Sequence, residues 1–265
     1  DDRPYQPGDD PRAVDWRGYA RTGRLTTRLF HAERATDVHV LVDTSPSMRL
    51  LGKDRWARAL ARMLAGAARL ESSLQLHAVP GGAAPPLRGD ALRPAGMEAA
   101  YRALPSPLPE PTADEADGGT SLGELFARTV VRLPRHAGSS LVIVISDLLD
   151  AATLQPLPRA TRARHADLLV LMTLAERERH PVAADLELHD VETGARLDVT
   201  PAEAAAYRAA LHDHEQRCRS ELLAAGARIV AATAPPEAAT APPAASYLDR
   251  AAFTRLVETG VLRRR

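Results

Sequence analysis

Short, continuous apolar runs alternate along this chain with longer segments in which apolar side chains recur every three or four residues. Runs of the first kind are typical of strands buried on both faces, and segments of the second kind are typical of helices with one buried face. The predicted strands are residues 38–42, 73–79, 141–145, 167–174 and 228–231. The predicted helices are residues 53–71, 121–133, 151–164, 201–225 and 246–258. This alternation predicts the α/β class, with a doubly wound, mostly parallel sheet flanked by helices.

One part of the chain departs from this alternation. Residues 186–190 and 195–199 flank a turn that contains Gly194, which predicts a β-hairpin inserted into the α/β pattern. The next residues offer Thr200 as an N-cap, Pro201 at the first helical position and an acidic side chain in the first turn. They therefore predict that a long helix begins directly after the hairpin.

The same pattern divides the chain into three parts. Residues 1–37 are rich in charge, Gly and Pro, and we expect them to form an N-terminal segment packed on the main domain. Residues 38–233 should form the α/β domain, with its hairpin near 185–199. Residues 234–265 should form a linker rich in Pro and Ala, followed by a C-terminal helix.

Oxygen-bearing side chains stand at the end of the first buried run. Asp43, Ser45 and Ser47 directly follow residues 38–42. Open parallel sheets place their ligand sites outside the carboxyl ends of strands. A carboxylate and two hydroxyls there suit a hard divalent cation such as Mg²⁺ or Mn²⁺. By itself the pattern is weak, because Asp and Ser are also ordinary turn and N-cap residues.

Two later segments add oxygen-bearing side chains. Thr120 stands at the start of the predicted helix 121–133, where a hydroxyl can cap the helix or bind an ion. The apolar run 141–145 ends in Ser146 and Asp147, so a second buried strand also carries a carboxylate at its carboxyl end. If the two strands are parallel neighbours, Asp43 and Asp147 share one edge of the sheet, with the Thr120 loop beside them.

These three loops resemble the metal-ion-dependent adhesion site of von Willebrand factor A domains. In that family the first loop supplies Asp-x-Ser-x-Ser, the second a Thr and the third an Asp after a hydrophobic strand. The resemblance implies a von Willebrand A-like, Rossmann-type fold and a bound Mg²⁺ or Mn²⁺. It also implies that an open coordination position accepts a Glu or Asp of a partner protein. The implied direct or water-mediated ligands are Asp43, Ser45, Ser47, Thr120 and Asp147.

Segments upstream and downstream of the first loop resemble a bacterial family, number fifty-eight of the domains of unknown function. The resemblance is carried by residues 5–12, 14–16, 20–21, 33, 146–148 and 190–194. Members of that family are typically encoded beside MoxR-type AAA+ ATPases. The resemblance therefore implies a MoxR-type ATPase as partner, an acidic client protein, and a chaperone-like or complex-maturation role without enzymatic activity.

Composition narrows these expectations further. Lysine and arginine together number 34, as do aspartate and glutamate, so no net charge favours nucleic acid or an anionic membrane. Every basic residue except Lys53 is Arg, which indicates a coding bias.

The single Cys218 excludes an internal disulfide framework and is compatible with a reducing compartment. No apolar stretch approaches the ~18 residues of a membrane span. We expect a cytoplasmic location, with an anchor upstream of the visible chain as the alternative, because some relatives carry membrane helices there.

Two other functions remain as alternatives. A scaffold could retain the three loops without binding metal, and would bind partners through the N-terminal segment and the hairpin around Gly194. A metal-dependent phosphohydrolase would use Asp43 as its nucleophile, but Ser45 stands where such enzymes need a second carboxylate as general acid. The chain has no phosphate-binding glycine loop.

His214 and Cys218 lie one helical turn apart, which we interpret as a solvated helix face and not as a zinc site.

Overall fold

The computed structural model of this chain forms two compact units, Asp1–Arg34 and Ala35–Arg265. The residues that it describes are 2–4, 16–23, 26–28, 37–67, 73–88, 95–96, 99–100, 121–134, 140–149, 154–182, 184–189, 194–240 and 246–261. The first unit holds a small antiparallel pair of strands and a short helix: β1 (Asp2–Pro4), β2 (Thr26–Arg28) and α1 (Trp16–Thr22).

The second unit is built on a sheet of six strands, in the order β10-β7-β6-β3-β4-β5. All neighbouring pairs are parallel except β4 and β5. This arrangement confirms the predicted α/β class and the doubly wound, mostly parallel sheet. The strands are β3 (Asp37–Asp43), β4 (Ser73–Val79), β5 (Leu87–Arg88), β6 (Ser140–Ser146), β7 (Ala166–Met172) and β10 (Arg228–Ala231).

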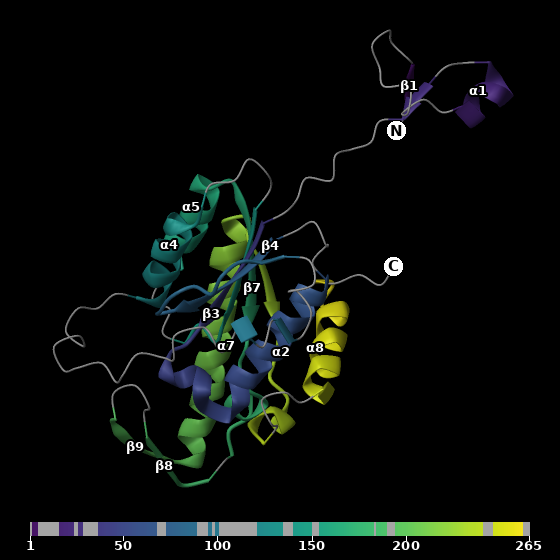
Figure 1. Cartoon of the computed structure of the whole chain (residues 1–265). Coiled ribbons are helices and arrows are strands. Elements are labelled where there is room, and N and C mark those ends of the chain that lie inside the picture. Colours follow the sequence, from purple (N-terminus) through teal and green to yellow (C-terminus); the bar gives the residue numbers. More distant parts are fainter. Residues whose placement is uncertain are drawn as a thin grey trace. The chain divides into compact units, whose positions relative to one another are not determined.

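Helices cover both faces of this sheet (Figure 1). Side chains alternate along a strand, so Val40 and Val42 pack in one core cluster with α2 and α8, while Leu41 packs in the other with α4, α5 and α7. The helices are α2 (Lys53–Ala67), α4 (Leu122–Arg132), α5 (Pro156–Ala163), α6 (Glu176–Arg179), α7 (Pro201–Ala224) and α8 (Ser246–Glu258), with the 3-10 helices η2 (Pro46–Gly52) and η5 (Pro236–Ala239). Among the described helices, none combines the length and the apolar character needed to cross a membrane.

The hairpin and the helix after it follow the sequence closely. β8 (Leu186–His189) pairs antiparallel with β9 (Arg196–Val199), as predicted. Thr200 caps α7, accepting a hydrogen bond from the Glu203 backbone, and the Glu203 carboxylate accepts one from the Thr200 N–H in return. The predicted N-cap at Thr200 is therefore confirmed, and the reciprocal hydrogen bonds make it a capping box.

Helix α5 is shorter than the sequence pattern indicates. It begins at Pro156, whereas the prediction began at residue 151. Proline has no N–H to donate to the preceding turn, so a helix tends to start at a proline. Residues 150–153 lie outside the described part of the chain.

Residues 232–240, which follow β10, are fixed to helix α2. The Trp56 indole N–H donates to the Ala232 carbonyl at 2.7 Å, and Arg55 donates to the Ala239 carbonyl at 2.8 Å. Ala234 and Ala238 are fully buried in the core cluster of α2 and α8. This segment, rich in Pro and Ala, therefore contributes to the core of the second unit, and it contains the short helix η5.

Two buried histidines face each other on neighbouring strands of the sheet. The Nδ1 atom of His39 lies 3.3 Å from the Nε2 atom of His77. Burial, and then the neighbouring His39, lowers the pKa of His77 from 6.5 to about 4. The fold thus favours neutral His77, so this group contributes stability above pH 6.5 that is lost as the pH falls towards 4.

We expect His77→Leu to make the protein less sensitive to acid. Between pH 7.5 and pH 5 the wild type should lose about 2 kcal/mol more of its free energy of unfolding than the variant does. Urea denaturation at the two pH values measures this difference. An equal loss in both proteins would show that His77 is not held neutral by the fold.

Candidate functional site

The carboxyl ends of β3 and β6 form the point at which the sheet reverses its strand order. From β3 the chain builds outward through β4 and β5 on one side, and through β6, β7 and β10 on the other. In such sheets the crevice outside the two central strand ends is the usual ligand position. Asp43 is the last residue of β3 and Asp147 directly follows β6. Both side chains are only 2% exposed.

Hydrogen bonds hold the carboxylate of Asp43 in one orientation. Its Oδ1 atom accepts from the Ser45 backbone N–H at 2.9 Å, and its Oδ2 atom accepts from the Ser146 hydroxyl at 2.6 Å. The Ser146 hydroxyl oxygen in turn accepts from the Leu148 N–H. Burial, and then the neighbouring charge of Asp147, raises the pKa of Asp43 from 3.8 to about 6. Two carboxylates therefore repel each other at this edge, and a cation would relieve that repulsion.

The two serines of the first loop bring their hydroxyls together. The Oγ atoms of Ser45 and Ser47 lie 3.1 Å apart, and both residues are half-buried. Ser45 occupies the position before η2, but its side chain makes no capping hydrogen bond there. The ordinary explanation of such a serine as an N-cap therefore does not account for this hydroxyl.

Thr120 lies outside the described residues. The first described residue of that loop is Ser121, which is the N-cap of α4 and accepts from the Glu124 N–H at 3.4 Å. Ser121 is thus the cap of this helix, and the prediction that Thr120 caps the helix or binds an ion lies outside the described residues.

A buried lysine contacts the third loop. The Nζ atom of Lys53, the first residue of α2, lies 2.7 Å from the Oδ2 atom of Asp147. The same ammonium also pairs with a carboxylate oxygen of Glu178 on α6. Lys53 is fully buried. The sequence pattern predicts neither partner of this lysine, although it carries one signal: Lys53 is the only lysine in a chain whose other basic residues are all Arg.

Glu178 connects this ion pair to the helices beyond it. Its second carboxylate oxygen accepts from the Ala175 N–H at 2.6 Å. The next residue, Arg179, pairs with Glu215 of α7 at 2.6 Å. Burial, and then the charges of Glu178 and Asp147, raises the pKa of Tyr207, also on α7. The ion pair of Arg179 and Glu215 thus joins α6 to α7 beside the site.

Comparison with known proteins adds a partial family match. Residues 1–80 match a family described as "Protein of unknown function DUF58". The match includes Asp43, Ser45, Ser47 and Lys53, and ends before the loop of Asp147. Among curated proteins nothing matches the chain.

One solved structure aligns with most of this chain. It is described as "von Willebrand factor type A from Catenulispora acidiphila", has 16% sequence identity and gives a TM-score of 0.40. The alignment covers 84% of this chain and 43% of that chain. The present chain therefore spans less than half the length of that protein, and at this level of likeness we carry no functional argument across.

The residues at the edge of the sheet fit a hard divalent cation in donor type. Carboxylates of Asp43 and Asp147 and hydroxyls of Ser45 and Ser47 are all oxygen donors, which Mg²⁺ and Mn²⁺ prefer. Among the described residues, Lys53 is the cation that contacts Asp147 and Glu178, so the acidic side chains of Asp43, Asp147 and Glu178 outnumber it, and a divalent ion would offset their charge. Within the described ranges, no group of three or more His, Cys, Asp or Glu side chains could hold a metal. A site here would thus depend on hydroxyl ligands.

Exposed apolar side chains flank this acidic edge. Leu50 lies three residues after Ser47 in η2 and is 41% exposed, and Leu149 lies two residues after Asp147 and is 38% exposed. Tyr207, whose pKa is raised in part by the charge of Asp147, is 42% exposed. Large apolar groups beside a polar centre are typical of surfaces that bind other proteins.

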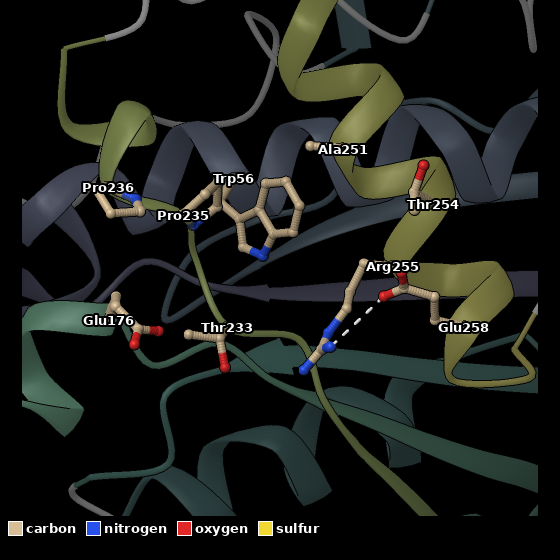
Figure 2. Close-up of a pocket in the computed structure, with 9 residues that line it drawn as sticks. All are labelled: Trp56, Glu176, Thr233, Pro235, Pro236, Ala251, Thr254, Arg255 and Glu258. Atoms are coloured by element: carbon tan, nitrogen blue, oxygen red, sulfur yellow. Dashed lines mark ion pairs between the residues drawn. The ribbon is translucent and has the colours of Figure 1, made fainter.

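A separate pocket lies between α8 and the segment before it (Figure 2). It encloses about 500 Å³, with Trp56 lying between Pro235 and Arg255, and the Arg255 guanidinium pairs with Glu258 at 3.7 Å. Trp56 is 2% exposed and its indole N–H is already bonded within the protein. None of the predicted ligands lines this pocket, so we do not regard it as the functional site.

His214 and Cys218 do not lie on a solvated face, in contrast to the expectation from sequence. The Nε2 atom of His214 lies 2.9 Å from the Leu148 carbonyl oxygen and 3.5 Å from the Cys218 sulfur. Cys218 is buried, and burial raises the pKa of its thiol to about 11. A protonated thiol is a poor metal ligand. This pair therefore packs α7 against the third loop.

Proposed function

We propose that this chain is a protein-interaction domain whose von Willebrand A-like site binds Mg²⁺ or Mn²⁺ and captures a carboxylate of a partner protein. Asp43, Ser45, Ser47 and Asp147 would hold the ion, together with Thr120. When bound, the ion supplies a Lewis-acidic position that accepts a Glu or Asp side chain. The chain's own residues orient the oxygen donors and bury the site.

One observation carries this proposal more than the others. The Asp43 carboxylate is buried beside a second carboxylate, at the strand-order reversal, and this raises its pKa to about 6. Perturbed carboxylates at such positions are typical of functional sites, because a fold gains nothing in stability from burying two repelling charges. The hydroxyl pair of Ser45 and Ser47 supplies the remaining donors.

Features outside the ligand set support a protein partner. The apolar side chains of Leu50, Leu149 and Tyr207 can pack around a captured acidic side chain. Leu188 and Leu197 are cross-strand partners on the hairpin and are 47% and 63% exposed. By resemblance, we propose a MoxR-type AAA+ ATPase as a component of the system, with an acidic client and a chaperone-like role. The ATPase would supply the nucleotide chemistry.

The ion pair of Lys53 and Asp147 favours one alternative. A scaffold with a vestigial metal site would use the ammonium as a permanent internal cation, and would bind partners without metal. The phosphohydrolase alternative gains no such support, because Ser45 replaces the general acid that it needs.

Metal and partner titrations separate these functions. We expect Mn²⁺ and Mg²⁺ to bind the purified full chain in calorimetric titration. We also expect the MoxR-type ATPase from the same organism to co-elute with the chain in Mg²⁺ but not in EDTA. Asp43→Ala should abolish both results while the circular dichroism spectrum stays unchanged.

Each alternative predicts a different outcome. Full binding of the ATPase in EDTA would support the scaffold and contradict metal-dependent capture. Turnover of para-nitrophenyl phosphate that disappears in Asp43→Asn would support the hydrolase, and we expect no turnover.

A further inference from the structure

The only lysine of the chain is enclosed between two carboxylates that come from different elements. Lys53 begins α2, Asp147 follows β6, and Glu178 lies in α6. The ammonium is fully buried, and its partners are 2% and 12% exposed. A buried ammonium is tolerated only with such counter-charges around it.

Lys53 engages the same carboxylate that the proposed metal site requires. The Oδ2 atom of Asp147 accepts from the ammonium at 2.7 Å, and its Oδ1 atom accepts from the Leu149 N–H at 3.1 Å. Both oxygens of Asp147 are therefore engaged by donors within the protein. A divalent ion at this edge must share Asp147 with a positive charge, which Coulomb repulsion makes unfavourable.

Glu178 offers the ammonium a second position. Its Oε1 atom already contacts the Nζ atom of Lys53, while its Oε2 atom is held by the Ala175 N–H. A small rotation of the lysine side chain can thus transfer the ammonium from Asp147 towards Glu178. In that position the charge would still be paired with a carboxylate.

We propose that Lys53 is a built-in competitor of the divalent ion for Asp147, and that the ion binds strongly only when the ammonium moves onto Glu178. This inference rests on the proposed function and specifies its regulation. A partner's carboxylate adds a negative charge at the ion and offsets the repulsion by Lys53. Ion and acidic partner should then bind cooperatively, and the ion alone should bind weakly.

Two variants on opposite sides of the ammonium test this mechanism, with Mn²⁺ alone as the probe. Lys53→Met removes the charge and keeps an unbranched apolar side chain, and should tighten Mn²⁺ binding at least about tenfold. Glu178→Gln leaves the ammonium on Asp147 and should weaken Mn²⁺ binding about threefold or more. Calorimetry and the electron paramagnetic resonance signal of free Mn²⁺ measure both affinities.

Arg62→Met is the matched control. Arg62 is a second buried cation of α2, 4% exposed, and it pairs with Asp249 of α8 at 2.7 Å. The substitution should destabilise the fold as the loss of a buried ion pair does, yet leave the Mn²⁺ affinity unchanged. Opposite shifts in Lys53→Met and Glu178→Gln are a result that lost packing alone would not give.

The outcomes separate this inference from the proposed function. Equal Mn²⁺ affinity in the wild type and Lys53→Met would overturn competition by Lys53 and leave the metal site intact. Binding of Mn²⁺ in Lys53→Met alone would support competition, and the Mg²⁺-dependent co-elution of the ATPase would then decide whether the wild type captures metal together with its partner. An absence of binding in both proteins would overturn both proposals. If Lys53→Met does not fold, Glu178→Gln decides, because unchanged or tighter binding there contradicts the competition.

Discussion

Asp43→Asn is expected to raise the free energy of unfolding by about 3 kcal/mol at pH 7.5 in metal-free buffer. The fold raises the pKa of Asp43 to about 6, so it favours the protonated carboxyl group. The stability from this group is complete below pH 4, and is lost as the pH rises through 6. Asparagine removes the charge and keeps both hydrogen bonds, since its oxygen can accept from the Ser45 N–H and its NH₂ can donate to the Ser146 hydroxyl oxygen.

The same substitution should also remove any stabilisation by Mn²⁺. Thermal unfolding with and without Mn²⁺, and urea unfolding from pH 4 to 7.5, measure the two effects. Asp167→Asn, at an exposed position of β7, is the control and should change stability by less than about 0.5 kcal/mol. A lower free energy of unfolding in Asp43→Asn at pH 7.5 would show that the ionised carboxylate does not destabilise the fold.

Gly52→Ala is expected to lower the free energy of unfolding by about 3 kcal/mol or more. Gly52 ends η2 with a φ of +75°, in the left-handed region that side chains disfavour. A Cβ atom there would also overlap the backbone carbonyl of Ala238 in η5. The positive φ and the overlap both involve backbone atoms, so neither can be relieved by turning a side chain. Urea denaturation measures the loss.

Gly66→Ala provides a control in the next helix. Gly66 is exposed within α2, and a Cβ atom there would meet nothing within 4 Å. This substitution should be neutral or stabilise by up to about 1 kcal/mol, because alanine is the better helix former. If Gly52→Ala were as well tolerated as Gly66→Ala, the close approach of η2 to η5 would be wrong.

The fold was predictable because its strands and helices have simple periodicities. The strand Ser73–Val79, the strand Arg228–Ala231 and the helix Ser246–Glu258 have the boundaries that the pattern predicts. Buried parallel strands give continuous apolar runs, and the caps and prolines mark where helices start. Helix α5 began later than predicted because small and apolar residues before Pro156 resemble a helical pattern.

The site was only partly predictable, because its contacts join distant parts of the chain. Asp43 and Asp147 could be placed on one edge from the rule that parallel strands end together. The pairing of Lys53 with Asp147 spans 94 residues and that with Glu178 spans 125. No periodicity encodes such contacts, and Glu178 lies in the helix of four residues Glu176–Arg179, which the pattern did not predict. The sequence places Ser146 beside Asp147, but it does not predict that the Ser146 hydroxyl donates to Asp43.

The enclosure of the single lysine limits how the protein reacts with amine-directed reagents. Amine-directed reagents and acylating enzymes require an accessible, unprotonated side-chain amine, and the only one in the sequence is enclosed by acidic neighbours. Acylation of this amine would therefore proceed only when α2 separates from the loop after β6. The rate of labelling at that one position would report how often this part of the domain opens, without any engineered probe.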